Sequence, residues 1–144
     1  MSYYTGAPGT VIMSASPVPR PRSVVLVVED DEPSRAILAY RVEKKLGLRA
    51  LTADNGVRGM EVLRARGGAV DLILVDENMP WMDGYEMCRQ VRRISSVPIL
   101  FFTADQGGYG RVAARARQAG ADTVVTKPFS NAEELHALIR RLLL

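Results

Sequence analysis

The chain has 144 residues, of which 47% are hydrophobic and 24% are charged, and its formal net charge is +3. This is enough apolar material for one packed core, whereas the length is short for two ordinary domains. No stretch is long and apolar enough to cross a bilayer, and the first residues lack the pattern of a secretory signal, so we expect a cytoplasmic protein. The nineteen Lys and Arg residues are scattered, which argues against a patch dedicated to nucleic acid. The single cysteine, Cys88, excludes an internal disulfide.

Residues 1–22 are rich in glycine and proline and have no sustained hydrophobic period. Such a composition resists regular structure, and we expect a flexible N-terminal arm. From Ser23 the pattern changes to short β-branched runs that alternate with helical stretches. The sequence therefore predicts one folded domain over residues 23–144.

Five short runs in this domain have the length and composition of β-strands. Their alternation with helical stretches is typical of a parallel sheet that helices cover on both faces. The first, third and fourth runs are apolar throughout, as strands buried on both faces should be. The predicted strands are 24–28, 49–52, 72–75, 99–102 and 123–125.

Two sets of apolar residues between and after these strands recur at helical spacing. Both sets predict helices that face the core, and the whole domain then consists of five β-α units. The first set is Leu38, Val42 and Leu46, and the second is Leu135, Leu138, Ile139 and Leu142.

Polar and charged residues follow four of the five predicted strands. In an open parallel sheet, ligands bind outside the carboxyl ends of the strands, so residues at these ends are candidates for a site. We therefore expect three carboxylates, a hydroxyl and an ammonium to converge at one edge of the sheet. They belong to Glu29, Asp30, Asp76, Thr103 and Lys127.

Three crowded carboxylates repel one another, and a hard divalent cation such as Mg²⁺ would relieve that repulsion. With a cation bound, one carboxylate can attack a phosphoryl group and become an aspartyl phosphate. Lys127 and Thr103 can then hold the remaining phosphoryl oxygens.

Four segments of the sequence, taken together and in order, resemble the signatures of response-regulator receiver domains, in particular those of single-domain, chemotaxis-type regulators in two-component signalling. The resemblance covers residues 23–144 and implies a flavodoxin-like α/β fold: a doubly wound, five-stranded parallel sheet of order 2-1-3-4-5, flanked by five helices. The segments are residues 24–32 (VVLVVEDDE), residues 76–84 (DENMPWMDG), Thr103-Ala104 and Lys127-Pro128-Phe129.

The resemblance implies that Asp76 is the phosphoacceptor. It also implies a Mg²⁺ site, which Mn²⁺ could share, with Asp30, Asp76 and the backbone carbonyl of Asn78 as ligands and Glu29 acting through water. The chain would be a signalling switch and not an enzyme, catalysing only its own phosphorylation and dephosphorylation.

For the switch itself, the resemblance makes Lys127 the phosphate partner and Thr103 the hydroxyl that turns inward on phosphorylation. Where the family commonly has an aromatic residue, three positions before Lys127, this chain has Val124, so a muted or altered switch is one reading and a plain strand residue is the other. Asn78 and Asp105 match the positions that tune dephosphorylation in chemotaxis-type regulators, and they predict a phosphoryl group lost within seconds to minutes.

Partners follow from the same resemblance. The phosphate would come from a histidine kinase or a phosphotransfer protein, because His136, which we expect to be a solvated side chain on the last helix, is a poor candidate donor. Output would pass to a downstream protein, without direct DNA binding, from a monomer or weak homodimer. The alternatives are a pseudo-receiver that binds partners without phosphorylation and a phosphatase of the haloacid-dehalogenase type, which normally needs a second Asp where this chain has Asn78.

Two surface features are open at this point. The residues beside the phosphoacceptor segment, Trp81 and Met82, form either a partner contact or a covered loop. Three arginines form either a basic ridge for an acidic partner or a solvated helix face; they are Arg111, Arg115 and Arg117.

Overall fold

The computed structural model describes residues 23–105, 107–127 and 132–144. The predicted arm, residues 1–22, and Pro128 and Phe129 of the fourth signature lie outside the described residues. The strands are β1 (Val24–Val28), β2 (Arg49–Ala53), β3 (Leu72–Asp76), β4 (Ile99–Thr103) and β5 (Thr123–Thr126). The helices are α1 (Glu32–Tyr40), α2 (Gly56–Arg66), α3 (Gly84–Arg92), α4 (Tyr109–Ala119) and α5 (Ala132–Leu142), with a π-helical turn η1 (Arg41–Lys45) and a 3₁₀ turn η2 (Gly67–Ala69).

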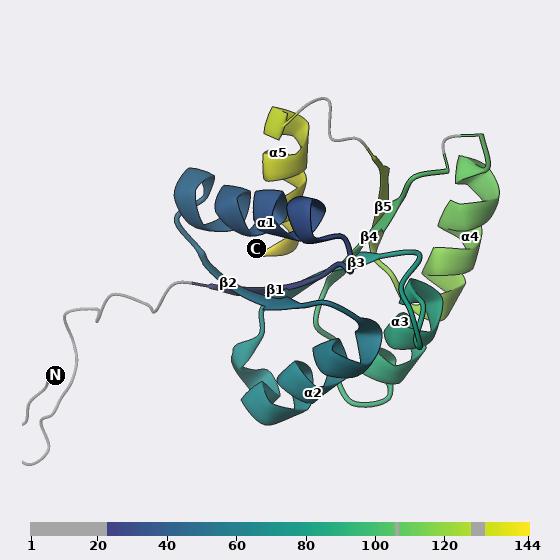
Figure 1. Ribbon diagram of the computed structural model, residues 1–144, viewed down its shortest axis with the longest axis horizontal. Helices are drawn as coiled ribbons and strands as arrows, with labels where there is room; N and C mark the ends of the chain where they lie inside the picture. The colour runs from purple at the N-terminus through teal and green to yellow at the C-terminus, as the bar shows by residue number, and fades with distance from the viewer. Residues whose placement is uncertain (1–22, 106, 128–131) are drawn as a thin grey trace, which may run out of the picture.

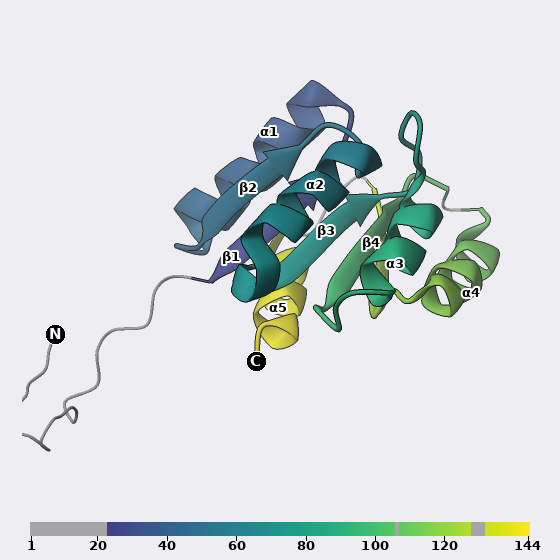
Figure 2. The same cartoon turned by 90° about the horizontal axis from the view of Figure 1, so that it is seen from below.

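All five strands pair in parallel, in the order β2-β1-β3-β4-β5, which confirms the predicted fold class and strand order. Figure 1 shows α1 and α5 on one face of this sheet, and Figure 2 looks onto the other face, which α2, α3 and α4 cover. Every residue of β1, β3 and β4 is buried, as predicted for strands covered on both faces. The predicted strands differ from the observed ones only at their carboxyl ends, where β2, β3, β4 and β5 each run one residue further.

Two hydrophobic clusters lie on opposite faces of the sheet. One contains Leu38 and Val42 together with Leu135 and Ile139, so the two predicted helical stripes pack into the same core layer. The other joins the inner faces of α2, α3 and α4 to the opposite side chains of the strands. Because strand side chains alternate between faces, the same strands supply both clusters.

Side-chain caps fix where three of the helices begin. The carboxylate of Asp31 accepts a hydrogen bond from the Ser34 amide (3.0 Å) at the start of α1. Asn55 caps α2 in the same way, and Asp83 caps α3 by accepting from the Glu86 amide (2.9 Å). Each cap satisfies an amide that the first helical turn leaves unpaired. The caps after β1 and β3 therefore end the loops that carry the candidate site.

Candidate functional site

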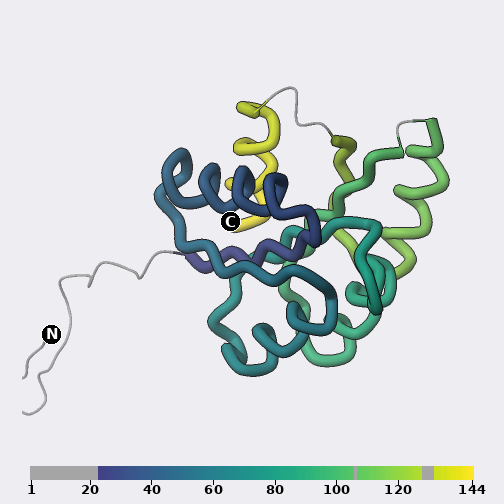
Figure 3. The backbone as a smooth tube through the Cα atoms, in the orientation of Figure 1, coloured from purple at the N-terminus to yellow at the C-terminus, as the bar shows by residue number. Residues whose placement is uncertain are grey.

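Three carboxylates meet at the carboxyl ends of β1 and β3. Glu29 and Asp30 directly follow β1, and Asp76 is the last residue of β3. Carboxylate oxygens of the three residues lie within 4.8 Å of one another. The Glu29 side chain is buried, with 1% of the residue exposed, whereas Asp30 is exposed to solvent. Figure 3 shows the segments after β1 and β3 meeting at the same end of the sheet.

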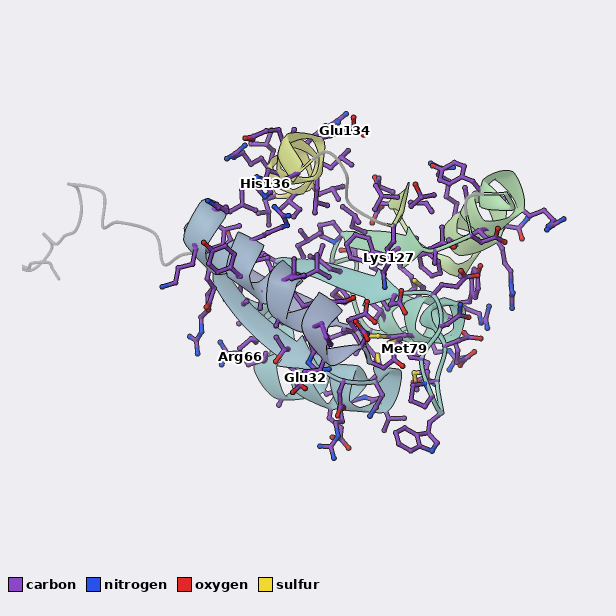
Figure 4. All side chains as sticks on the ribbon, turned by 45° about the horizontal axis from the view of Figure 1, so that its top comes forward. Glu32, Arg66, Met79, Lys127, Glu134 and His136 are labelled. Carbon is purple, nitrogen blue, oxygen red and sulfur yellow. The ribbon has the colours of Figure 1, made fainter. Side chains whose placement is uncertain are left out.

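Lys127 brings a positive charge to this cluster from the end of β5. Its Nζ lies 2.9 Å from Oδ1 of Asp76 and also forms an ion pair with Glu29. Its backbone amide donates to the carbonyl of Thr103 (2.8 Å), which ties the residue to the end of β4. In Figure 4 the Lys127 side chain points toward the carboxylate oxygens. The structure thus brings together the lysine and all three acidic residues that the sequence predicted.

Burial raises the pKa values of two carboxyl groups in the cluster. Desolvation raises the pKa of Asp76 above its ordinary value, and the bonds to Lys127 offset this only in part. The pKa of Glu29 is raised for the same reason. Burial by itself would lower the pKa of Lys127, but its hydrogen bonds to Glu29 and Asp76 reverse the direction and raise it. The ammonium of Lys127 therefore stays charged, and its interactions offset the burial of Asp76 and Glu29 only in part.

The donor set at this end of the sheet suits a hard divalent cation. It consists of carboxylate oxygens from Glu29, Asp30 and Asp76. Among the described residues, this cluster contains neither His nor Cys. Mg²⁺ prefers oxygen ligands, keeps several waters and commonly binds through one or two carboxylates. The exposed carboxylate of Asp30 leaves one side of the cluster open to water. The residues present therefore fit the predicted magnesium site.

Thr103 ends β4 with its side chain fully buried. Its hydroxyl donates to Oε1 of Glu77 (2.6 Å) and accepts from the amide of Asp105 (3.0 Å). The hydroxyl of Tyr85, on α3, donates to the other oxygen of Glu77 (2.8 Å). Sequence reasoning did not predict the hydrogen bonds of Glu77 to Thr103 and Tyr85; the available signal was only that Glu77 directly follows the predicted phosphoacceptor.

Gly84 allows α3 to begin directly against the backbone of Asp76. A Cβ at this position would lie 2.4 Å from the carbonyl oxygen of Asp76 and 2.9 Å from the ring of Phe101. The Gly84 amide also donates to the carbonyl of Glu77 (2.9 Å). Because Gly84 has no side chain, α3 can pack directly against the segment that carries Asp76 and Glu77 and hold it in place.

The remaining predicted site residues lie around the rim. Asn78 is exposed, and so is Asp105, whose carboxylate accepts from the Gly108 amide (2.7 Å) just before α4. Val124 is buried in β5, and its carbonyl accepts from the hydroxyl of Tyr109, the first residue of α4 (3.0 Å). An aromatic side chain therefore does contact β5 here, although it comes from α4.

The expectation for His136 is wrong, and the two residues beside the phosphoacceptor segment differ in exposure. His136 is buried, with 5% exposed, and not solvated as expected, because α5 packs its His136 side toward α1 and η1. Trp81 is 83% exposed with a positive φ of 67°, whereas Met82 is half-buried and packs against the core. Among the three arginines of α4, Arg115 stacks its guanidinium on the ring of Tyr85 at 3.9 Å from the centroid.

The sequence profile of the response regulator receiver domain family matches residues 25–140. Among curated proteins, the chain is 37% identical over 115 residues to the uncharacterized transcriptional regulatory protein YrkP of Bacillus subtilis, covering 80% of this chain and 47% of that one. It is 39% identical over 119 residues to the sensory transduction protein RegX3 of Mycolicibacterium smegmatis, covering 83% and 50%. The chain thus spans about half the length of these relatives.

Solved structures show the same likeness. The chemotaxis protein CheY4 of Vibrio cholerae superposes with a TM-score of 0.73 at 27% identity, covering 85% of this chain and 99% of that one. A putative two-component system response regulator with a GGDEF domain gives a TM-score of 0.75 at 28% identity, covering 85% and 49%. In the part of the chain that the structure describes, no helix has the length and apolar character needed to cross a membrane.

Proposed function

The chain belongs to the response regulator receiver domain family, a family of signalling modules of two-component systems, and we propose that it is a phosphorylation-activated switch whose phosphoacceptor is Asp76. The observation that supports this most strongly is the meeting of Asp76 with Lys127, Glu29 and Asp30 at one end of the sheet. These four groups are what an aspartyl phosphate needs: a nucleophile, a fixed cation and ligands for a second cation.

The reaction is a transfer of one phosphoryl group to a carboxylate oxygen of Asp76. A bond forms between that oxygen and phosphorus, the bond from phosphorus to the donor breaks, and the donor atom takes a proton from water. Bound Mg²⁺, held by Asp30, Asp76 and the carbonyl of Asn78 with Glu29 acting through water, would offset the charge on the phosphoryl oxygens. Lys127, already 2.9 Å from Asp76, would exchange this contact for a phosphoryl oxygen.

The donor in this proposal is a histidine kinase or a phosphotransfer protein in the cytoplasm. His136 is not a donor candidate within the chain, because it is buried on α5. Output passes to a protein and not to DNA, since the Lys and Arg residues are scattered along the sequence. The receiver acts as a monomer or weak homodimer.

The test is the intact mass of the protein after incubation with acetyl phosphate and Mg²⁺. We expect a gain of one phosphoryl group in the native protein, and no gain in Asp76→Asn or when Mg²⁺ is withheld. Asp71→Asn is the matched control, since this carboxylate accepts from the Val24 amide at the start of β1, away from the candidate site. A native protein that gains no mass would contradict the proposal and favour a receiver fold that binds partners without phosphorylation.

A further inference from the structure

The hydroxyl of Thr103 has a single proton, which it donates in a hydrogen bond to the carboxylate of Glu77. The donation to Oε1 of Glu77 is short, at 2.6 Å, and the oxygen of Thr103 also accepts from the Asp105 amide. A hydroxyl can donate only one hydrogen bond at a time. Thr103 therefore has to give up Glu77 before it can donate to a phosphoryl oxygen on Asp76.

A second hydrogen bond connects Glu77 to α3 and, through the ring of Tyr85, to α4. Its Oε2 accepts from the hydroxyl of Tyr85 (2.8 Å), and the Tyr85 ring lies buried against Phe101, with centroids 4.9 Å apart. The guanidinium of Arg115, on α4, covers the same ring at 3.9 Å. Continuous contacts thus run from the end of β4, through Glu77, to the surface of α4.

A stacked guanidinium reports movement of the ring beneath it, because cation–π attraction depends on the position of the cation over the ring face. The Tyr85 hydroxyl and the Thr103 hydroxyl share one carboxylate, so loss of one donor alters the position and charge of the acceptor that the other donor retains. Arg115 itself is exposed on its outer side, where a partner can reach it.

We propose that Glu77 competes with the phosphoryl group for the proton of Thr103 and thereby transmits the state of Asp76 to Tyr85 and Arg115 at the α3–α4 surface. This inference rests on the proposed function. It assigns to Glu77 and Tyr85 a positioning role in the switch, and it provides a route to α4 that does not need an aromatic residue at Val124.

The structure offers a second contact to α4, which makes a matched control. Tyr109 donates its hydroxyl to the carbonyl of Val124 in β5, so it links α4 to the sheet without touching Glu77. Tyr85→Phe removes the bond to Glu77 but keeps the ring under Arg115. Tyr109→Phe removes one tyrosine hydroxyl of the same kind from the other contact.

The experiment follows the Arg115 Nε–Hε signal by NMR, assigned through its loss in Arg115→Lys. Beryllium fluoride with Mg²⁺ serves as the phosphoryl mimic. We expect the mimic to shift this signal in the native protein and in Tyr109→Phe, and most of the shift to be lost in Tyr85→Phe. Equal shifts in Tyr85→Phe and the native protein would overturn the inference.

A second measurement tests the competition at Glu77. The amide of Glu77→Gln has one acceptor oxygen in place of two, so it holds Thr103 less firmly, and we expect a several-fold longer lifetime of the phosphoryl group on Asp76. In a Thr103→Val background, which has no hydroxyl to release, Glu77→Gln should leave the lifetime unchanged. A lifetime that Glu77→Gln alters equally in both backgrounds, or in neither, would overturn the inference.

These outcomes separate the inference from the proposed function. If the native protein gains a phosphoryl mass but the tyrosine variants behave alike, only the role of Glu77 and Tyr85 fails. If the native protein neither gains mass nor responds to beryllium fluoride, the proposed function fails, and the inference fails with it.

Discussion

Lys127 brings one positive charge to a cluster of three acidic residues, so a single ammonium faces three groups that can each carry a negative charge. Burial raises the pKa values of both Asp76 and Glu29, because desolvation disfavours their charged forms, and a bound cation would favour those forms. A ligand that binds only the folded state stabilises it by mass action, by about 2.7 kcal/mol at a hundredfold excess over its dissociation constant.

Near-saturating Mg²⁺ should therefore raise the free energy of unfolding of the native protein by about 2–3 kcal/mol, and Asp30→Asn should lose most of this gain. The measurement is urea denaturation with Mg²⁺ or with EDTA. Glu61→Gln, an exposed residue of α2, is the control and should respond like the native protein. An equal Mg²⁺ effect in Asp30→Asn and in Glu61→Gln would show that Asp30 is not a ligand.

The lifetime of the phosphoryl group should depend on Asn78 and Asp105. Both are exposed at the rim of the site, where their side chains can contact the water molecule that hydrolyses the aspartyl phosphate. The carboxylate of Asp105 also holds the Gly108 amide, which fixes its position before α4. We predict loss of the phosphoryl group within seconds to minutes, measured as decay of the phosphorylated mass after acetyl phosphate is removed. A decay that takes many hours with Mg²⁺ present would contradict this.

The sequence predicts the residues at strand ends well because a parallel sheet places all its carboxyl ends at one edge. That rule alone predicts that four residues lie close together, and the structure brings them together: Glu29, Asp30, Asp76 and Lys127. The bond between Glu77 and Tyr85 could not be found this way. It depends on how closely α3 packs against β3, which strand order does not determine.

The start of α3 is the element boundary on which the site depends most. A Cβ at Gly84 would lie 2.4 Å from a backbone oxygen of Asp76, and neither helix nor strand can move freely at this point. Gly84→Ala should therefore destabilise the protein by about 1–3 kcal/mol, as overpacking typically does. Urea denaturation measures this cost.

Gly110 is the matched control for Gly84, because both lie in the first turn of a helix. A Cβ at Gly110 meets nothing within 4 Å, so Gly110→Ala should be neutral or stabilise by up to about 1 kcal/mol. If Gly84→Ala also proves neutral, then α3 moves away from Asp76 without cost, and the close approach does not position the phosphoacceptor.

The packing of α5 against α1 and η1 should make stability depend on pH. Burial lowers the pKa of His136, with repulsion from Arg41 and Arg140 acting in the same direction and Glu133 opposing it. The folded protein then binds fewer protons than the unfolded chain, whose histidine titrates near about 6.5. The stability from neutral His136 is therefore fully present above this value and is lost as the pH falls through the lowered pKa.

Urea denaturation between about pH 7.5 and about pH 5.5 tests this dependence, with His136→Leu as the variant that cannot titrate. We expect the native protein to lose more stability than the variant over this range. The comparison between variants removes the contribution of the carboxylates, which both proteins share. Parallel pH profiles would show that His136 does not contribute.

The burial of His136 also shows where a helical pattern stops being informative. The stripe of Leu135, Leu138, Ile139 and Leu142 correctly predicts the face of α5 that meets the sheet. The buried face is wider than this stripe, however, because it also includes His136, whose pKa the charge of Arg41, in the turn after α1, helps to lower. That turn is π-helical, a feature that the hydrophobic spacing does not predict.

In the molecule as a whole, the sheet separates two cores that share the same strands. One core contains α1 and α5, and the other contains α2, α3 and α4. Because β1, β3 and β4 contribute to both, loss of one core exposes the strands of the other. The alternation of strands and helices in the sequence already predicts this architecture. Parallel strands are joined by crossover connections, and the helices in these connections pack on the faces of the sheet.

Residues 1–22 are rich in glycine and proline and have no sustained hydrophobic period, a composition that resists regular structure. We therefore predict that residues 23–144 by themselves have the same free energy of unfolding as the full chain, to within about 0.5 kcal/mol, the range of surface changes. Urea denaturation of the two proteins measures this, and acetyl phosphate should phosphorylate both to the same extent. A larger loss of stability in the shorter protein would mean that residues 1–22 pack against the receiver domain, and a loss of phosphorylation alone would mean that they act on its site.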